Sequence, residues 1–342
     1  MVKLKSEVNE IEDVIRFKID FPPFDGLRFV CVYLLKADDI NILIDAGLHF
    51  RDWKNLFFSS LKNLNIAIKD IDYCIITHDH LDHLGLMRDL KRKNPNLQLL
   101  MHEITHEIIE WGTNPNKSKE LVNEARELAK RMIKYGISEK QGDRIVQVLT
   151  AMPKLARYQK PDKLLVDNEE ISIGTNKLKI IWTPGHAVGH ICVFDSDRRY
   201  LFSGDHILSE ITPHIGSFIM SPTLKKKYDF NNILDYYLRS LEKIVKLYPK
   251  IIFPAHQEVI YNPSERILEI KEHHKNRLKE ISNIIRNNPL TPVKIAEIHF
   301  GNDLTEINSF LALSEVLSHL IYLEDQKKIT RIEKNGKFLF SS

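Results

Sequence analysis

The N-terminal third of the chain alternates between short apolar runs and stretches in which apolar residues recur every three or four positions. The short runs are rich in Val, Ile and Phe and are bounded by turn residues, which is typical of buried β-strands. They cover 14–19, 29–35, 40–44, 71–76 and 97–101. Residues 56–64 and 84–92 have the spacing of amphipathic helices. Strands that alternate with helices predict an α/β fold.

A long stretch of helical character follows, from Glu107 to Leu155. Its apolar residues recur at helical spacing with Lys and Glu between them: Leu121, Ala125, Leu128, Ala129 and Met132. This pattern predicts a helical insertion over about 107–160. Two roles are open for it, a helical pair packed on the main body or a lid whose apolar face meets the substrate. The strand pattern then resumes over 163–166, 170–173, 178–182, 191–195, 200–203 and 251–253.

The C-terminal part begins at the break Asn262-Pro263, and its pattern changes from mostly strands to mostly helices. Helical spacing over 267–286, 293–299 and 309–324 precedes a hairpin predicted around Asn335-Gly336, a strong type I′ turn signal. His273 and His274 on the first of these helices are expected at the surface. Helices followed by such a two-stranded wing resemble a winged-helix domain, so we expect domains over 1–262 and 263–342. The helix that would read nucleic acid, 313–320, is nearly devoid of Lys and Arg. A structural or substrate-cleft role is therefore favoured over nucleic-acid binding.

The charge of the chain refines this picture only slightly. The 49 basic and 46 acidic residues give a net charge of +3, so only a local patch would indicate nucleic acid. The basic run Lys225-Lys226-Lys227, expected in a polar loop over 221–227, is either a solvated charge run or a site for an anionic substrate.

The expected compartment is the cytoplasm. Three widely spaced cysteines in apolar runs, Cys31, Cys74 and Cys192, indicate buried free thiols and a reducing environment. Residues 1–20 lack the apolar segment of a signal peptide. No run reaches the ~20 apolar residues of a membrane span, so no membrane partner is expected. The sequence gives no indication of the oligomeric state.

The candidate chemistry starts at the end of the apolar run 73–76. There the chain continues Thr77-His78-Asp79-His80-Leu81-Asp82-His83, an H-x-H-x-D-H pattern. Open α/β sheets place their sites at such strand ends, and imidazole with carboxylate suits zinc, iron and manganese. His78 and His80 can flank one ion across a tight turn, while Asp82 and His83 can reach a second.

Further candidate ligands follow later apolar runs. His186 stands in a Pro-Gly-His turn, Asp205 in Gly-Asp-His and His256 in Pro-Ala-His. His190 and His206 lie close to these positions, and each is as much a supporting or structural candidate as a catalytic one.

A competing motif lies at His102-Glu103-Ile104-Thr105-His106, which matches the H-E-x-x-H of zinc proteases. That motif needs both histidines on one helix and a third ligand downstream. Here it directly follows an apolar strand, so we interpret it as a chance match at a strand-to-helix junction, although one of its histidines still has the position to line the cleft.

The H-x-H-x-D-H segment and the later strand-end residues resemble the signature of the metallo-β-lactamase superfamily. The resemblance implies an αββα sandwich holding two divalent metal ions, zinc first, with iron or manganese as alternatives. It assigns His78, His80 and His186 to one ion, Asp82, His83 and His256 to the other, and Asp205 to the bridge between them. In the same family an aspartate in a D-x-G turn, here Asp45, supports the metal loop by hydrogen bonding.

The resemblance implies a dinuclear metal-dependent hydrolase in which a metal-bridging hydroxide attacks an ester or thioester of a small anionic substrate. Asp205 and Asp82 are the candidate catalytic residues. The helical insertion and the C-terminal winged helix are similar to the glyoxalase-II-like, β-lactamase-like protein 2 branch, which includes single-strand endoribonucleases. A ribonuclease is therefore the first alternative. A nucleic-acid-binding regulator that uses the winged helix is the second.

Overall fold

The computed structural model describes residues 4–21, 28–216 and 219–342. Within these residues the first sheet has seven strands in sequence order. They are β1 (Ser6–Ile11), β2 (Val14–Asp20), β3 (Phe29–Ala37), β4 (Ile40–Ile44), β5 (Tyr73–Ile76), β6 (Gln98–His102) and β7 (Lys163–Leu165). The strands β1 to β4 pair antiparallel, and β4 to β7 pair parallel.

The second sheet faces the first and has five strands among the described residues. Their order is β12 (Ile251–Pro254), β11 (Tyr200–Gly204), β10 (Ile191–Asp195), β9 (Asn176–Trp182) and β8 (Glu170–Ile173). The strands β11 and β12 are parallel, so Gly204 and Pro254 end side by side at one edge. Asp205 and Ala255-His256 leave the sheet at that edge.

Strand β3 explains why the predicted strands of this chain are uninterrupted apolar runs and do not alternate apolar with polar residues. Successive side chains of a strand point to opposite faces of the sheet. Val30, Val32 and Leu34 enter the core on one face, and Cys31, Tyr33 and Leu35 enter the core between the two sheets. Both faces of the sheet are therefore buried, and polar alternation is lost.

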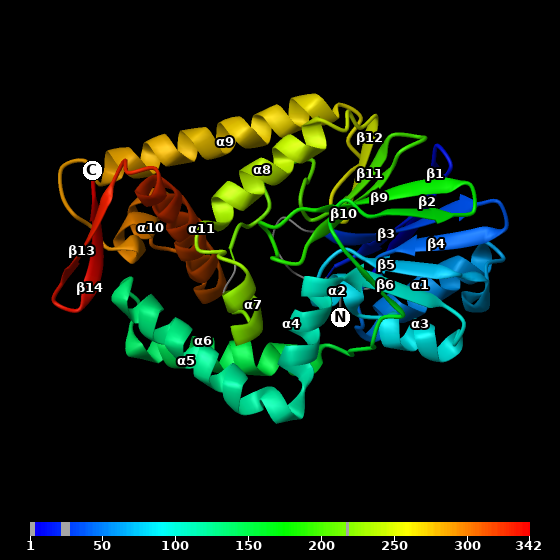
Figure 1. Ribbon diagram of the computed structural model, residues 1–342, viewed down its shortest axis with the longest axis horizontal. Helices are drawn as coiled ribbons and strands as arrows, with labels where there is room; N and C mark the ends of the chain where they lie inside the picture. The colour runs from blue at the N-terminus through cyan, green and yellow to red at the C-terminus, as the bar shows by residue number, and fades with distance from the viewer. Residues whose placement is uncertain (1–3, 22–27, 217–218) are drawn as a thin grey trace.

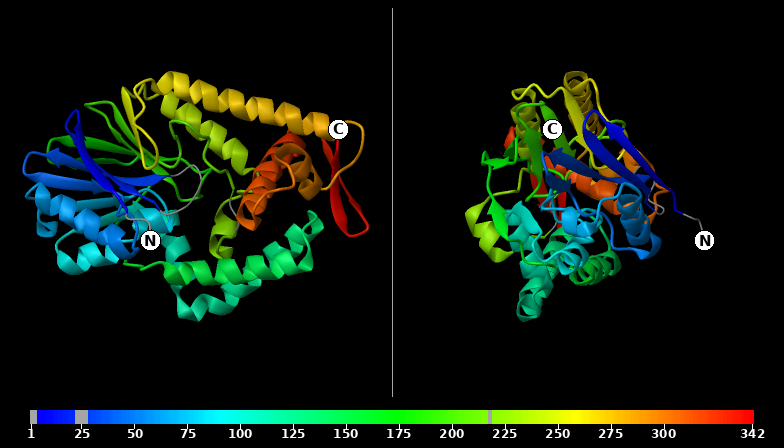
Figure 2. Two further views of the ribbon diagram at one scale, coloured as in Figure 1. Left: turned by 180° about the vertical axis from the view of Figure 1, so that it is seen from behind. Right: turned by 90° about the vertical axis from the view of Figure 1, so that its right-hand side faces the viewer.

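Helices cover the two outer faces, as Figures 1 and 2 show. Helices α1 (Arg51–Asn63) and α3 (Met87–Lys93) bury Trp53, Phe57 and Leu90 against the first sheet. Helices α8 (Ile233–Val245) and α9 (Pro263–Ile284) bury Leu241 and Ile267 against the second. The layers are helix, sheet, sheet and helix, which confirms the predicted αββα fold.

The predicted helical insertion consists of α4 (Glu103–Thr113), α5 (Ser118–Lys134) and α6 (Glu139–Ala151). The apolar stripe predicted along α5 is buried throughout. Leu128 and Met132 of this stripe pack against Leu313 and Leu317 of α11 (Glu306–Asp325). The stripe therefore contacts the C-terminal helices, and a lid function remains a prediction.

The C-terminal elements are α10 (Pro292–Phe300), α11 and the antiparallel pair β13 (Thr330–Lys334) and β14 (Lys337–Ser341). Asn335 and Gly336 both have positive φ, 52° and 71°, as a type I′ turn requires. Helix α9 contributes Ile267 to the core under the second sheet and Ile281 to the C-terminal core. Helix α9 therefore runs from the sandwich to the C-terminal helices (Figure 1). The winged-helix assignment and the boundary at 262/263 stay predictions.

Two local predictions were wrong. Residues 221–227 are not a loop, because Ser221 accepts a hydrogen bond from Leu224 N at 3.1 Å and starts the short helix α7 (Pro222–Lys227). Ser before Pro is a favourable helix start. The other error is His274, expected on the surface of α9, which is 1% exposed because it faces α11 and bonds His319. Strand β1 and helix α8 were not predicted.

Among the described residues no helix is long and apolar enough to cross a membrane.

We expect Phe340→Ala to lower the free energy of unfolding by about 3–5 kcal/mol, because the ring is fully buried in the C-terminal core and truncation leaves a cavity. Urea unfolding measures this. Ile332→Ala, on the paired strand but 44% exposed, is the matched control and should change stability by less than about 0.5 kcal/mol. Equal unfolding midpoints for the two variants would contradict this account of the C-terminal core.

Candidate metal centre

The predicted site residues come together at one edge of the sandwich. His78, His80 and His83 follow β5, with His83 in the short helix α2 (Leu81–Leu84). His186 lies in the connection between β9 and β10, and Asp205 follows β11. Asp82 and His256 complete the set. The structure thus joins all seven residues that the resemblance had assigned.

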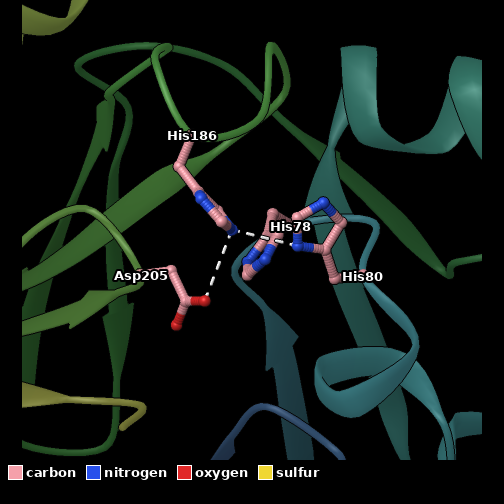
Figure 3. A group of neighbouring side chains, drawn as sticks. All are labelled: His78, His80, His186 and Asp205. Atoms are coloured by element: carbon pink, nitrogen blue, oxygen red, sulfur yellow. Dashed lines mark hydrogen bonds and ion pairs between the residues drawn. The ribbon is translucent and has the colours of Figure 1, made fainter. Parts of the chain in front are cut away.

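A first group consists of His78, His80, His186 and Asp205, shown in Figure 3. His186 Nε2 lies 3.0 Å from His80 Nδ1 and 3.3 Å from Asp205 Oδ2. His78 is fully buried, whereas His80 is exposed. This group is therefore open to solvent on the His80 side.

A second group consists of Asp82, His83 and His256. His256 Nε2 lies 3.2 Å from Asp82 Oδ2, and His83 Nε2 lies 3.6 Å from the same oxygen. Asp205 also touches this group: its Oδ1 is 3.5 Å from His83 Nε2 and its Oδ2 is 3.4 Å from His256 Nε2. One carboxylate therefore lies within 3.5 Å of imidazoles from both groups.

Fixed partners orient the imidazoles through their Nδ1 atoms. His78 Nδ1 is 3.0 Å from Thr77 Oγ1, and His83 Nδ1 is 2.8 Å from Asp45 Oδ2. Backbone carbonyls do the same elsewhere: His186 Nδ1 donates to His214 O at 3.0 Å, and His256 Nδ1 donates to Phe29 O at 2.7 Å. Histidines that bind metal almost always have their second nitrogen held in this way. The sequence analysis missed these carbonyls, because a backbone group carries no residue-type signal.

Asp45 has the supporting role that the D-x-G turn predicted. Its Oδ1 accepts from Thr77 N at 2.8 Å, and its Oδ2 accepts from Thr77 Oγ1 at 3.0 Å as well as contacting His83. Its own backbone is left-handed, with φ 64°. Such a conformation costs an ordinary residue about 1 kcal/mol or more, and the three side-chain contacts offset it. Thr77, which no motif indicated, is the partner that connects Asp45 to His78.

Several donor atoms at the centre are buried and unpaired. Among the described residues, the Nε2 atoms of His78, His83 and His256 have no hydrogen-bond partner, and the same holds for Asp205 Oδ1. Each unpaired buried polar atom costs about 1–3 kcal/mol. A divalent cation that accepts these lone pairs removes that cost, and this donor set suits zinc, iron or manganese. The residues therefore fit the metal site that the fold implies.

The charge at the centre is suited to a cation. Burial lowers the pKa of His83, but the carboxylates of Asp205 and Asp82 raise it by more, so that it ends well above 6.5. Burial also lowers the pKa of His256, but Asp205 and Asp82 raise it by more, to about 10. Both shifts reflect a concentrated negative charge between the imidazoles, which a divalent ion neutralises directly.

His190 and His206 lie behind the centre. His190 is fully buried, bonds Thr183 Oγ1 through Nδ1 at 2.8 Å and accepts from Asp205 N at 3.1 Å through Nε2. It therefore orients the backbone of Asp205. Gly204 has φ 50°, and a Cβ there would lie 2.6 Å from His190 Nε2, so glycine is required beside this contact. His206 packs against the ring of Tyr237.

The H-E-x-x-H motif does not form a metal site with both histidines on a helix. His102 is the N-cap of α4, accepts from Ile104 N and stacks on Trp182. His106 bonds the hydroxyl of Tyr158 at 2.9 Å. Within the described residues neither joins a group of candidate ligands. The motif does stand at a strand-to-helix junction, as interpreted from the sequence.

Comparison with known proteins agrees with the fold and the donor set. Residues 25–256, more than half of the chain, match the family model described as the metallo-beta-lactamase superfamily. The chain therefore belongs to this superfamily. It is a hydrolase, and its fold implies divalent metal ions.

Two curated relatives and one solved structure illustrate the likeness. The probable metallo-hydrolase YqjP of Bacillus subtilis is 24% identical, over 97% of this chain and 98% of its own length. The acyl-coenzyme A thioesterase MBLAC2 of Bos taurus is 26% identical, over 51% of this chain and 57% of its own. A crystal structure of a metallo-beta-lactamase family protein from Thermus thermophilus has a TM-score of 0.76 at 22% identity, over 97% and 99% of the two chains. Its fold is thus shared across the C-terminal helices as well as the sandwich.

We expect Asp45→Ala to weaken the binding of zinc to the His83 group by about 10–100-fold, because His83 loses the acceptor that fixes its ring. Competition with a chromophoric chelator measures the affinity. Asp39→Ala, at an exposed position just before the same strand β4, is the control and should bind zinc as the unmodified protein does. Equal affinities for both variants would show that Asp45 has no part in the site.

We expect the double variant His102→Ala, His106→Ala to keep its full metal content, whereas His78→Ala should lose metal, because only His78 lies among the converging donors. Elemental analysis after reconstitution with zinc, iron or manganese measures the ions per chain. Two ions are expected in the double variant. Loss of metal from it would revive the protease interpretation.

Proposed function

We propose that the protein is a dinuclear metal-dependent hydrolase that cleaves an ester or thioester of a small substrate. The observation that carries this proposal is the place of Asp205, whose carboxylate lies within 3.5 Å of His186, His83 and His256. In this proposal His78, His80 and His186 hold one ion, Asp82, His83 and His256 hold the other, and Asp205 binds both. The native metal is proposed to be zinc, with iron or manganese as alternatives.

When bound, two divalent ions supply an activated water at neutral pH and polarise the oxygen of the group attacked. The chain's own residues position these ions and the water. The backbone N–H of Asp205 is held by His190, which keeps the carboxylate between the two groups, where it would also orient the attacking water. Asp82, between His83 and His256, is the second carboxylate available for this task. The exposed His80 borders the open side, where a substrate enters.

Charge pairing around α7 favours a small substrate over RNA. The basic run of α7 had been a candidate anion site, but Lys225 pairs with Glu124 of α5 and Lys227 pairs with Glu103 at 2.9 Å. Both lysines therefore tie α7 to the insertion. A nuclease needs several cationic side chains that bind phosphates. Because Lys225 and Lys227 are paired with glutamates, they are less available for such binding.

The buried face of α11 argues in the same direction. Its residues Leu313, Val316, Leu317 and Leu320 are packed into the helical cores. A helix buried on this face has less surface left to enter a nucleic-acid groove. The similarity to the acyl-coenzyme A thioesterase MBLAC2 supports the thioester as substrate class. Membership of the β-lactamase-like protein 2 branch, with a C-terminal winged helix, and a cytoplasmic location remain part of the proposal.

The helical elements also leave room for the organic part of a substrate. A cavity of about 410 Å³ is lined by residues of α5, α7, α8 and α11, by the segment 228–231 and by Tyr135, Gly216 and Met220. Its apolar lining includes Leu128, Met132, Met220 and Phe230. This volume is within the range of small-molecule sites. Gly216 is two positions beyond His214, whose carbonyl holds His186, so the cavity borders the segment that supports the first group.

We expect metal-dependent cleavage of an acyl thioester or carboxylic ester to exceed cleavage of single-stranded RNA, and Asp205→Ala to lower kcat by roughly 10³-fold or more through loss of the shared carboxylate. A panel of thioester, ester, phosphodiester and RNA substrates on the reconstituted protein measures this. Asp197→Ala, at an exposed turn position before β11, should retain full activity.

The same panel tests the alternative. Efficient cutting of single-stranded RNA without turnover of any ester or thioester would replace the proposal by a ribonuclease. Binding of RNA would then weaken with salt at a slope near −0.7 for each phosphate contact.

A further inference from the structure

One buried carboxylate in the outer helical layer is shared by several basic side chains. Asp89 of α3 is 1% exposed. Its Oδ2 accepts a hydrogen bond from Arg157 Nη1 at 2.8 Å, and its Oδ1 accepts one from Lys54 Nζ at 3.4 Å. His49 Nδ1 lies 3.1 Å from Oδ2, and Arg92 Nη2 lies 3.7 Å from Oδ1. Several cationic side chains thus surround a single anion, and the group carries surplus positive charge.

This surplus distinguishes the group from the lysines of α7. Lys225 and Lys227 each pair with a glutamate of their own. In the part of the chain that the structure describes, Lys54 and Arg157 pair with no carboxylate other than Asp89. Only Nη1 of the Arg157 guanidinium donates hydrogen bonds to these residues, so its Nε and Nη2 are available for a further partner.

Lys54 and Arg157 are held in place without being covered. Their side chains are 29% and 31% exposed, so each is partly shielded from water and still open to a ligand. Partial burial strengthens the attraction between a cation and an anion. A guanidinium already fixed through one nitrogen loses less conformational freedom when the rest of its fork binds a carboxylate or a phosphate. The arrangement is therefore preorganised for an anionic group.

The same group lies against the helix that carries Asp82 and His83. Gly85, two positions after His83, donates from its backbone N to the carbonyl of Gly47 at 2.8 Å. A Cβ on Gly85 would lie 2.3 Å from His49 N, so these two backbone segments are in close contact. An anion bound by this group would therefore be held beside the segment that supplies candidate metal ligands.

We propose that Lys54 and Arg157, held by Asp89, form a subsite for an anionic group of the substrate, a carboxylate or a phosphate. The inference rests on the proposed function in so far as the bound molecule is taken to be the substrate of the metal centre. Arg157 follows η3 (Met152–Leu155), the last helical turn of the insertion. The insertion thereby contributes to substrate recognition through a charged residue.

Two pairs of substrates test this subsite on the zinc-loaded protein. Acetyl phosphopantetheine and acetyl pantetheine differ by one phosphate, and the nitrophenyl monoester of succinic acid differs from its methyl ester by one carboxylate charge. We expect KM for the anionic member of one pair to be about 10-fold lower than KM for its uncharged partner, because a hydrogen bond between charged groups contributes that much to binding. The pair that shows the preference identifies the anionic group.

Matched variants locate the preference. Lys54→Met should reduce it to about 2-fold or less, because one of the two cations is lost. Lys62→Met removes an exposed lysine from the same helix, α1, and should retain it. Arg157→Lys keeps the charge without the fork and should fall between these two variants. Calorimetric binding of inorganic pyrophosphate or of succinate, whichever matches the preferred pair, is a second readout that needs no turnover and should weaken about 10-fold in Lys54→Met.

Each other result has a defined meaning. An unmodified protein without preference for either anionic substrate overturns the subsite, and so do equal KM ratios and equal anion binding in Lys54→Met and Lys62→Met. A Lys54→Met variant that loses only stability towards urea shows that the pairs with Asp89 are structural, and the proposed function then stands without the subsite. Anion binding that depends on Lys54, without cleavage of any ester or thioester, supports the anion site and overturns the proposed function.

Discussion

Asp45 makes the contacts on which the geometry of the centre depends most. It stands where β4 ends beside β5, and its carboxylate binds the backbone and hydroxyl of Thr77 and the ring of His83. The loop that leaves β5 is thereby fixed at its first residue and again six residues later. A ligand loop with free ends would spread its imidazoles apart, because their unpaired nitrogens and the neighbouring carboxylates gain by being solvated. The buried carboxylate of Asp45 holds the loop in a conformation that brings its candidate ligands together.

Two other candidate ligands are held in the same way, with backbone carbonyls in place of the Asp45 carboxylate. His256 is held by Phe29 O at the start of β3, and His186 by His214 O. Each acceptor comes from a different part of the chain, so the centre is assembled only when both sheets and the connecting segment are in place. Although these candidate ligands lie on loops, the rings of His186 and His256 are thus held from behind by groups that the fold positions.

The helices beyond the sandwich are part of this assembly. Helix α9 runs from the core under the second sheet into the C-terminal core, and α11 packs on the insertion helix α5. Lys225 and Lys227 of α7 form ion pairs with α5 and α4. A cavity lies among these helical elements, lined mainly by residues of α5, α11 and the segment 228–231. The insertion and the C-terminal helices therefore pack against one another through a shared core.

The sequence by itself indicated most of the strands and the candidate ligands, and the family resemblance of these residues implied the sandwich. The apolar runs are continuous because both sheet faces are buried, and the H-x-H-x-D-H pattern is dense enough to stand out along one short segment. Asn335-Gly336 likewise predicted its turn, since the signal lies within two adjacent residues. All these features depend on neighbouring positions and so are visible in the order of residues.

The tertiary structure decided what depends on residues far apart in the chain. The burial of His274 followed from packing against His319, 45 positions later, about which its own surroundings carry no information. The carbonyls that orient His186 and His256 belong to the backbone, so no residue type in the sequence indicates them. Likewise, only the structure shows that Lys225 and Lys227 form ion pairs with glutamates. Long-range contacts are set by the packing of whole elements, which local sequence patterns do not encode.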